Sequence, residues 1–150
     1  MALYYLETSA LVKLYVRETG SARLLRLAAR INNHRFAVLV LARVEFHSAI
    51  RRRQREGDVD AQLAKHLLDQ FEQHMESKFI KQLMNDALID VATGLVDRHA
   101  LRAYDAVQLA GCIALKANAA GDEPIFVCSD RRLVEAAEAE GLSSLDPTVQ

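Results

Sequence analysis

The stretch LYYLETSALVKLYV, residues 3–16, decides the fold of this chain. It opens with a short apolar run rich in tyrosine, which is typical of a strand buried on both faces. Glu7 follows this run directly, and Thr8 or Ser9 can then cap a helix over residues 10–16. The stretch therefore predicts a strand, an acid and a helix in that order, as at the start of an α/β fold.

The rest of the chain alternates strand and helix patterns around this opening. Apolar runs predict further strands at residues 36–40, 79–83 and 125–128, the middle one weaker than the others. Residues with helical spacing and clear stops predict helices at 21–31, ended by Asn32 and Asn33, and at 41–55, 60–75, 86–99, 101–118 and 131–140. Strands that are apolar throughout favour a mainly parallel central sheet, of about four to five strands, flanked by helices.

Composition narrows the class of protein. The 150 residues are 51% hydrophobic and 26% charged with few Gly and Pro, which predicts one well-ordered domain over residues 1–150. A net charge of −1 excludes a global basic field, so any contact with nucleic acid must use a local patch. Cys112 and Cys128 have no motif spacing, and two buried free thiols are expected. Without a signal sequence or a long apolar run, no membrane contact and a cytoplasmic location are expected.

Four acids stand where solubility alone would not place them. Glu7 and Asp130 each follow a hydrophobic strand, and ligand sites of α/β sheets form at such strand ends. Glu45 lies on the small, apolar side of its helical stretch, and Asp105 lies near the start of another. Buried carboxylates need a cation, a partner or a proton, and no matching set of inward-facing Lys or Arg is evident. The pattern therefore favours a metal site.

The chemistry of these residues selects the metal, although each acid also has a simpler explanation. Oxygen ligands without His or Cys suit a hard cation, Mg²⁺ or Mn²⁺, which can bind a phosphodiester and activate water. Taken singly, Asp130 could only cap the last helix, and Asp105 could be a favourable charge in a first helical turn. Glu45 could form a buried salt bridge with an arginine. The joint placement of the four favours the metal.

Four segments, YYLETSALVKLY, LARVEFHSAIRR, LRAYDAVQLAGCIAL and FVCSDRRLVEAAEAEGL, resemble the blocks of PIN-domain ribonucleases, and most closely the VapC-type toxins of toxin-antitoxin pairs. The resemblance spans nearly the whole chain and implies a PIN-like fold. It also implies Mg²⁺- or Mn²⁺-dependent RNA hydrolysis that leaves a 5′-phosphate and a 3′-hydroxyl. The family's acidic quartet falls on Glu7, Glu45, Asp105 and Asp130, with Thr8 and Ser129 as supporting hydroxyls.

One position departs from the family pattern. Where the family usually has Asp, this chain has Glu7, whose carboxylate reaches about 1 Å further along the side chain. Because Mg²⁺ demands near-ideal geometry and misplacements of about 1 Å can cost on the order of 100-fold in rate, reduced activity is expected. The alternative is a catalytically impaired PIN-like module that binds RNA or protein.

Basic residues and partners complete these expectations. Arg51 and Arg52 belong to a dense basic run that could bind RNA, form a solvated helix face or contact an antitoxin. Arg131 and Arg132 are better placed for phosphate, beside Asp130. The resemblance implies a homodimer and a cognate antitoxin, for which residues 9–33 are the favoured docking surface. A receiver or phosphatase-like domain is a rival class, but it needs a nucleophilic Asp where Glu7 stands.

Overall fold

The computed structural model describes residues 1–30 and 33–149 and is built around a five-stranded sheet. The strand order is β3-β2-β1-β4-β5, and every pairing is parallel. The strands are β1 (Ala2–Leu6), β2 (His34–Leu39), β3 (Ile80–Gln82), β4 (Pro124–Val127) and β5 (Ser143–Leu145). The predicted α/β fold with a parallel sheet of four to five strands is confirmed. Ile31 and Asn32, expected at a helix end, lie outside the described residues.

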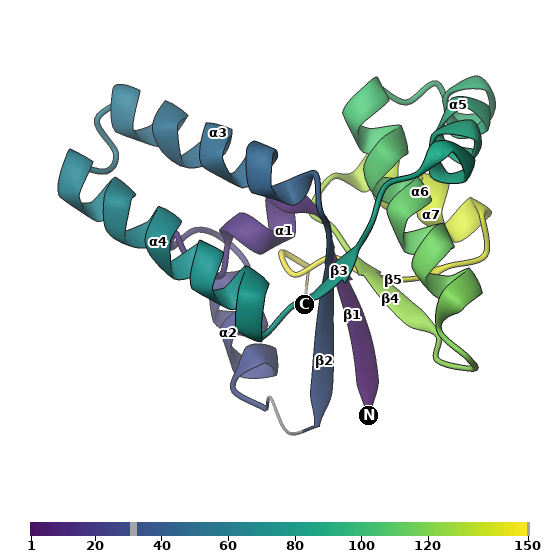
Figure 1. Ribbon diagram of the computed structural model, residues 1–150, viewed down its shortest axis with the longest axis horizontal. Helices are drawn as coiled ribbons and strands as arrows, with labels where there is room; N and C mark the ends of the chain where they lie inside the picture. Colours follow the sequence, from purple (N-terminus) through teal and green to yellow (C-terminus); the bar gives the residue numbers. More distant parts are fainter. Residues whose placement is uncertain (31–32, 150) are drawn as a thin grey trace.

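Helices cover both faces of this sheet, as Figure 1 shows. One layer contains α1 (Thr8–Val12), α2 (Ser21–Ala28), α3 (Ala42–Arg55) and α4 (Ala61–Ser77); the other contains α5 (Asp86–His99), α6 (Ala103–Asn118) and α7 (Arg131–Ala139). Side chains of β1 alternate between the two cores that result: Leu3 and Tyr5 pack toward α5 to α7, and Tyr4 and Leu6 toward α1 to α4. This two-sided burial explains why the strand is apolar throughout.

The structure differs from the sequence prediction mainly at short elements. The β5 strand was not predicted, because Ser143 to Leu145 is short, largely polar and only partly buried at the sheet edge. The helix expected over residues 10–16 is instead α1, Thr8–Val12, followed by tight turns through Tyr15. Both cysteines are free and buried, as expected. Among the described residues, no helix is both long enough and apolar enough to cross a membrane.

The strand order sets the position of the polar site. β1 pairs with β2 on one side and β4 on the other, so the order of the chain reverses between β1 and β4. At that point the Glu7 N–H donates to the Val127 carbonyl, 3.1 Å away, which extends the register just past both strands. The segments carrying Glu7 and Asp130 therefore leave the sheet side by side, at the edge where α/β folds bind ligands.

A buried tyrosine explains one glycine of α6. Tyr5 is fully buried, and its hydroxyl donates to the Gln108 carbonyl, 2.7 Å away. A Cβ added at Gly111 would overlap that hydroxyl and would also lie 3.0 Å from a methyl of Leu39. Only glycine allows the tyrosine ring to pass this close to the helix.

Gly111→Ala is therefore expected to lower the free energy of unfolding by about 1–3 kcal/mol, because the core must shift to accept the methyl. The matched control is Gly94→Ala in α5, where the added Cβ meets only the end of the Arg98 side chain, 3.0 Å away. That control should be neutral or gain up to about 1 kcal/mol from helix propensity. Urea unfolding measures both; equal effects at the two positions would show that the Tyr5 packing is loose.

Candidate metal and nucleic-acid site

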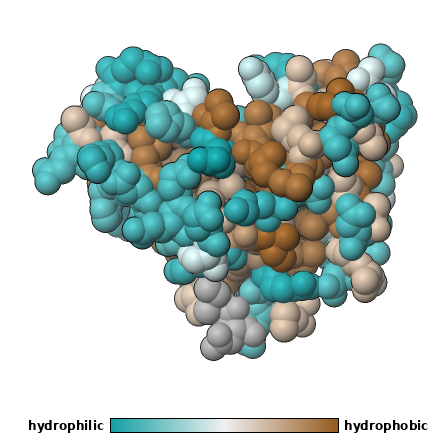
Figure 2. Space-filling model, in the orientation of Figure 1, coloured by the Kyte–Doolittle hydropathy of each residue, from teal (hydrophilic) through white to brown (hydrophobic). Residues whose placement is uncertain are grey.

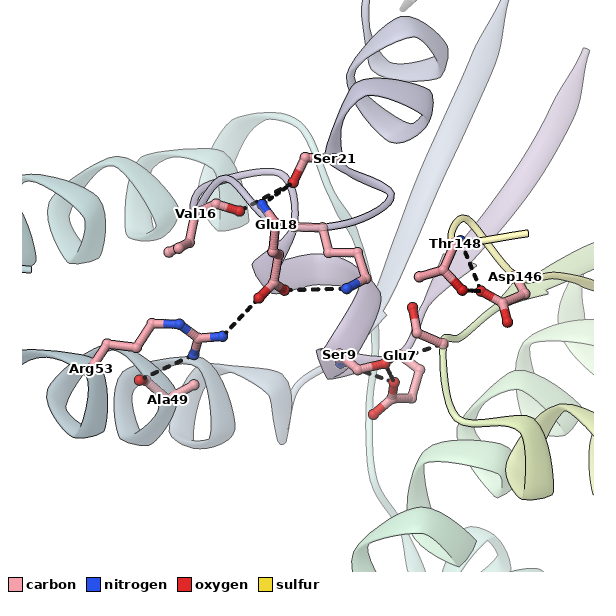
Figure 3. A network of polar contacts seen from close by, with 11 residues as sticks. Glu7, Ser9, Val16, Glu18, Ser21, Ala49, Arg53, Asp146 and Thr148 are labelled. Atoms are coloured by element: carbon pink, nitrogen blue, oxygen red, sulfur yellow. Dashed lines mark hydrogen bonds and ion pairs between the residues drawn. The ribbon is translucent and has the colours of Figure 1, made fainter. Parts of the chain in front are cut away.

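Glu7 connects the end of β1 to the start of α1. It is the N-cap of α1, and its Oε2 accepts hydrogen bonds from the Ser9 N–H, at 2.9 Å, and from the Ser9 hydroxyl (Figure 3). The side chain is only 7% exposed. Burial raises the pKa of Glu7; the Ser9 hydrogen bonds oppose this shift, and the negative charge of Glu45 adds to it. One carboxylate oxygen is thus committed to the helix start rather than directed at the other acids.

Glu45 lies in the first turn of α3 and contacts a neutral amide rather than an arginine. Its Oε1 accepts a hydrogen bond of 2.7 Å from the Gln108 side chain, which also donates to the Thr8 hydroxyl at 3.1 Å. Burial raises the pKa of Glu45, hydrogen bonds from Gln108 and Thr8 oppose this shift, and the charge of Asp105 adds to it. Because an amide carries no charge, Glu45 remains uncompensated when it is ionised.

Gln108 is a site residue that the sequence analysis did not single out. It is 1% exposed, and the Tyr5 hydroxyl lies 3.1 Å from its Oε1, which leaves its Nε2 facing Thr8 and Glu45. The sequence did carry a signal for Gln108, because it is the lone amide in the apolar run of α6. It also lies three residues after Asp105 and therefore on the same face of the helix. A buried amide of this kind requires partners, and here it connects the core to the acids.

Asp105 and Asp130 are the second pair of acids. Asp105 is partly buried in the first turn of α6, and its pKa is raised by burial and by the charge of Asp130, while Arg102 and Arg132 act in the opposite direction. Asp130 is exposed and caps α7, accepting from the N–H groups of Arg132, at 3.0 Å, and Leu133, at 3.4 Å. The helix-terminal roles that the sequence allowed are therefore both present, and the two carboxylates also repel one another.

The four predicted acids thus form a series in which each acts on the next. The charge of Glu45 raises the pKa of Glu7, that of Asp105 raises the pKa of Glu45, and that of Asp130 raises the pKa of Asp105. Across residues 1–30 and 33–149, no three His, Cys, Asp or Glu side chains converge as closely as a fully protein-ligated metal requires. Mg²⁺ usually keeps several waters and uses one or two carboxylates, so this oxygen-only donor set still fits a hydrated Mg²⁺ or Mn²⁺.

A groove of about 520 Å³ lies beside two of these acids, Glu7 and Glu45. In Figure 2 the surface is hollowed at its upper edge, between the side of α3 and the side of α5 and α6. The lining of the groove includes charged residues of both signs, namely Glu7, Glu18, Glu45, Lys13, Arg52 and Arg53. No matching set of inward-facing Lys or Arg was expected, and Lys13 is one buried cation that the sequence analysis did not single out, at only 8% exposed. The sequence concealed it: one lysine in the run ALVKLY resembles a surface residue.

Only some of the remaining predicted site residues line this groove. Arg52 lines it, whereas Arg51 faces a separate hollow with His47 and Glu72. Arg132 is close enough to Asp105 to lower its pKa, and the exposed Arg131 pairs with Glu135 at 3.1 Å. The buried Ser129 hydroxyl has no hydrogen-bond partner among the described residues, and its backbone N–H donates to the Ser9 hydroxyl at 3.3 Å.

The raised pKa values predict how metal and pH act on stability. An acid whose pKa is raised by folding favours the protonated form, so its contribution is present below the unfolded value and is lost as pH rises through the folded value. Glu7, Glu45 and Asp105 therefore destabilise the metal-free protein near neutral pH. Mn²⁺ at about 100 times its Kd at pH 7.5 should raise Tm by roughly 5–10 °C at that pH. The same Mn²⁺ concentration should raise Tm by clearly less at pH 5, where the carboxylates are more protonated and bind metal more weakly. Thermal melts at both pH values measure this; a Tm shift equal at both would contradict it.

Comparisons with known proteins identify a family and two similar structures. The family model described as the PIN domain matches residues 4–139. No curated protein matches the chain. Among solved structures, PAE2754 from Pyrobaculum aerophilum has a TM-score of 0.59 and 23% identity, covering 95% of this chain and 83% of its own. VapBC2 from Rickettsia felis, bound to a DNA fragment from their promoter, has a TM-score of 0.62 and 14% identity, covering 95% and 97%. These two likenesses concern the fold.

Proposed function

Because the chain belongs to the PIN-domain family, we propose that it is a metal-dependent endoribonuclease and acts as the toxin of a toxin-antitoxin pair. The observation that supports the proposal is the placement of the acids: Glu7 and Glu45 line one groove beyond β1, and Asp105 is close enough to Asp130, beyond β4, for the charge of Asp130 to raise its pKa. Such uncompensated charge is what a divalent cation would relieve. The adjoining groove, with both acids and cations in its wall, is suited to a phosphodiester strand.

The residues can be given roles in this reaction. Asp105, Asp130 and Glu7 would hold Mg²⁺ or Mn²⁺ directly or through water, which supplies a Lewis acid and lowers the pKa of a bound water. Glu45, held by Gln108 and near Thr8, would join them as a ligand or orient the attacking water. The Ser129 hydroxyl, which has no hydrogen-bond partner in the described part of the chain, would support a hydrated ligand. Arg132 beside Asp105 and Arg52 in the groove would contact phosphate.

Product analysis tests this reaction. The purified, antitoxin-free protein is incubated with pooled cellular RNA in Mg²⁺, Mn²⁺ or EDTA, and the product ends are identified. Hydrolysis by activated water predicts 5′-phosphate and 3′-hydroxyl ends that appear only with metal. Cyclic phosphate ends, or equal cleavage in EDTA, would exclude this mechanism.

A protein partner is part of the proposal. The similar Rickettsia felis structure is of VapBC2 with promoter DNA. For this chain we propose a cognate antitoxin that covers the acidic groove, homodimerisation and action on RNA in the cytoplasm. Residues 9–33, of which 31 and 32 lie outside the described part, remain the favoured docking surface. Co-expression with the adjacent gene product tests this; a harmless protein that purifies without a partner would contradict it.

A second function has one observation in its favour. Glu7 places an oxygen on Ser9 instead of toward the other acids, as expected if its extra methylene removes it from the metal site. A PIN-like module that binds RNA without cutting it would then result. RNA binding that persists while no metal supports cleavage would favour this alternative.

A further inference from the structure

A compact ion cluster lies in the groove, beyond the acids. Glu18 joins two cations: its Oε1 is 3.3 Å from the Lys13 ammonium, and its Oε2 is 3.0 Å from the Arg53 guanidinium. Figure 3 shows Glu18 and Arg53 facing one another on one side of the view, with Glu7 and Ser9 on the other. Lys13 is buried and Arg53 largely so, yet all three residues line the groove.

The cations are held in place before any ligand arrives. The Glu18 N–H donates to the Ser21 hydroxyl at 2.9 Å, and this hydroxyl donates to the Val16 carbonyl at 3.2 Å, which fixes the loop that carries Glu18. Arg53 also donates to the Ala49 carbonyl at 3.4 Å. A lysine has three N–H donors and an arginine five, so each cation keeps donors beyond those used here. Preorganised, charged donors are what a phosphate site requires.

The position of the cluster separates it from the reaction centre. Glu45 and Arg53 lie on the same helix, α3, eight residues and so about 12 Å apart along its axis. Likewise Glu7 caps the start of α1, and Lys13 its end. Acids thus stand at the beginning of both helices and cations at their end, which gives the groove an acidic half and a basic half. One phosphate cannot occupy both halves.

From this arrangement we infer that Lys13 and Arg53 bind a backbone phosphate that neighbours the scissile phosphate of the same RNA strand. Glu18 is the positioning residue for both cations. The inference rests on the proposed ribonuclease function and adds a substrate subsite to it. Arg52, which also lines the groove, lies next to this subsite along α3.

The test measures binding of a fluorescent single-stranded RNA oligonucleotide in EDTA, which prevents metal-dependent cleavage, between 50 and 200 mM salt. Lys13→Gln and Arg53→Gln should each weaken binding several-fold and flatten the plot of log K against log salt by about 0.7. Lys13→Arg should restore both quantities. Matched controls are Lys65→Gln and Arg43→Gln, which disrupt exposed ion pairs with Asp69 and Glu72 and should leave binding unchanged.

Glu18→Gln distinguishes a phosphate site from a cluster that only stabilises the fold. The glutamine keeps an amide oxygen that can still hold the cations but loses the negative charge that competes with phosphate for them, so the inference predicts a less stable protein that binds RNA more tightly. A purely structural cluster predicts weaker or unchanged binding in all three variants. Circular dichroism confirms that each variant is folded before its binding is measured.

Three results would overturn the inference: wild-type binding and salt slope in both Lys13→Gln and Arg53→Gln, weaker or unchanged binding in Glu18→Gln, or no RNA binding by the wild-type protein in EDTA. Cleavage of the same RNA by the wild-type protein in Mn²⁺ decides what else falls. If cleavage is seen, only the subsite is wrong; if it is absent, the proposed ribonuclease function is wrong as well.

Discussion

Asp105→Asn is expected to abolish metal-dependent RNA cleavage, with a loss of roughly 1,000-fold or more. Its carboxylate is partly buried and faces the charge of Asp130, so it is the member of the second acid pair that gains most from a cation. An amide removes the negative charge while keeping the shape. If the metal contributes several kcal/mol to the transition state, losing it costs three or more factors of ten in rate. The rate of cleavage of a labelled RNA in Mn²⁺ measures this.

The control for Asp105→Asn is Asp90→Asn, the same change at an exposed position of α5. It should cleave RNA at the wild-type rate. Asp105→Asn should also remain folded and become slightly more stable without metal, because the change removes a carboxylate that burial and Asp130 disfavour. A folded Asp105→Asn protein with more than a tenth of wild-type activity would remove Asp105 from the proposed metal site.

Glu7→Asp is expected to raise the cleavage rate, by on the order of 100-fold if the displaced carboxylate limits catalysis. In the structure the longer side chain of Glu7 folds back so that Oε2 accepts from Ser9. Aspartate is itself a favourable N-cap, so the shorter residue can start α1 and bring its carboxylate nearer to the backbone. Initial rates at saturating Mn²⁺, compared with wild type, measure the gain.

The control for Glu7→Asp is Glu76→Asp, a shortening of equal size at an exposed residue of α4. It should change neither rate nor stability. If Glu7→Asp cleaves no faster than wild type, the extra methylene is accommodated and Glu7 is a competent ligand. If neither protein cleaves RNA, the binding module becomes the better account.

The fold could be predicted because its signal is carried by buried strands. Residues 3–6 and 125–128 are apolar throughout. The first run is followed directly by Glu7, and the second by Ser129 and Asp130. That pattern predicted that Glu7 and Asp130 would project into one crevice if the strands were neighbours; the pairing of β1 with β4 is confirmed, and the shared crevice stays a prediction. The β5 strand was not predicted, because it is a three-residue edge strand that is only partly buried and lacks the apolar run by which the other strands were recognised.

The sequence singles out the acids of the candidate site but not the groups that hold them, and metal binding by these acids stays a prediction. Carboxylates in apolar surroundings are conspicuous because burial of charge is costly. Gln108 and Lys13 were missed because an amide or a lysine in a helix is usually exposed, and only the fold shows that they are buried. The partner of Glu45 was also beyond reach of the sequence, since Gln108 lies 63 residues away.

The most direct test of the account is RNA cleavage followed across a titration of Mn²⁺ into metal-free protein, with heat of binding recorded over the same concentrations. A metal-dependent ribonuclease that uses these acids predicts that cleavage rises from zero in step with metal binding and that both are lost in Asp105→Asn. Cleavage that persists without metal, or that does not follow metal binding, would contradict the account.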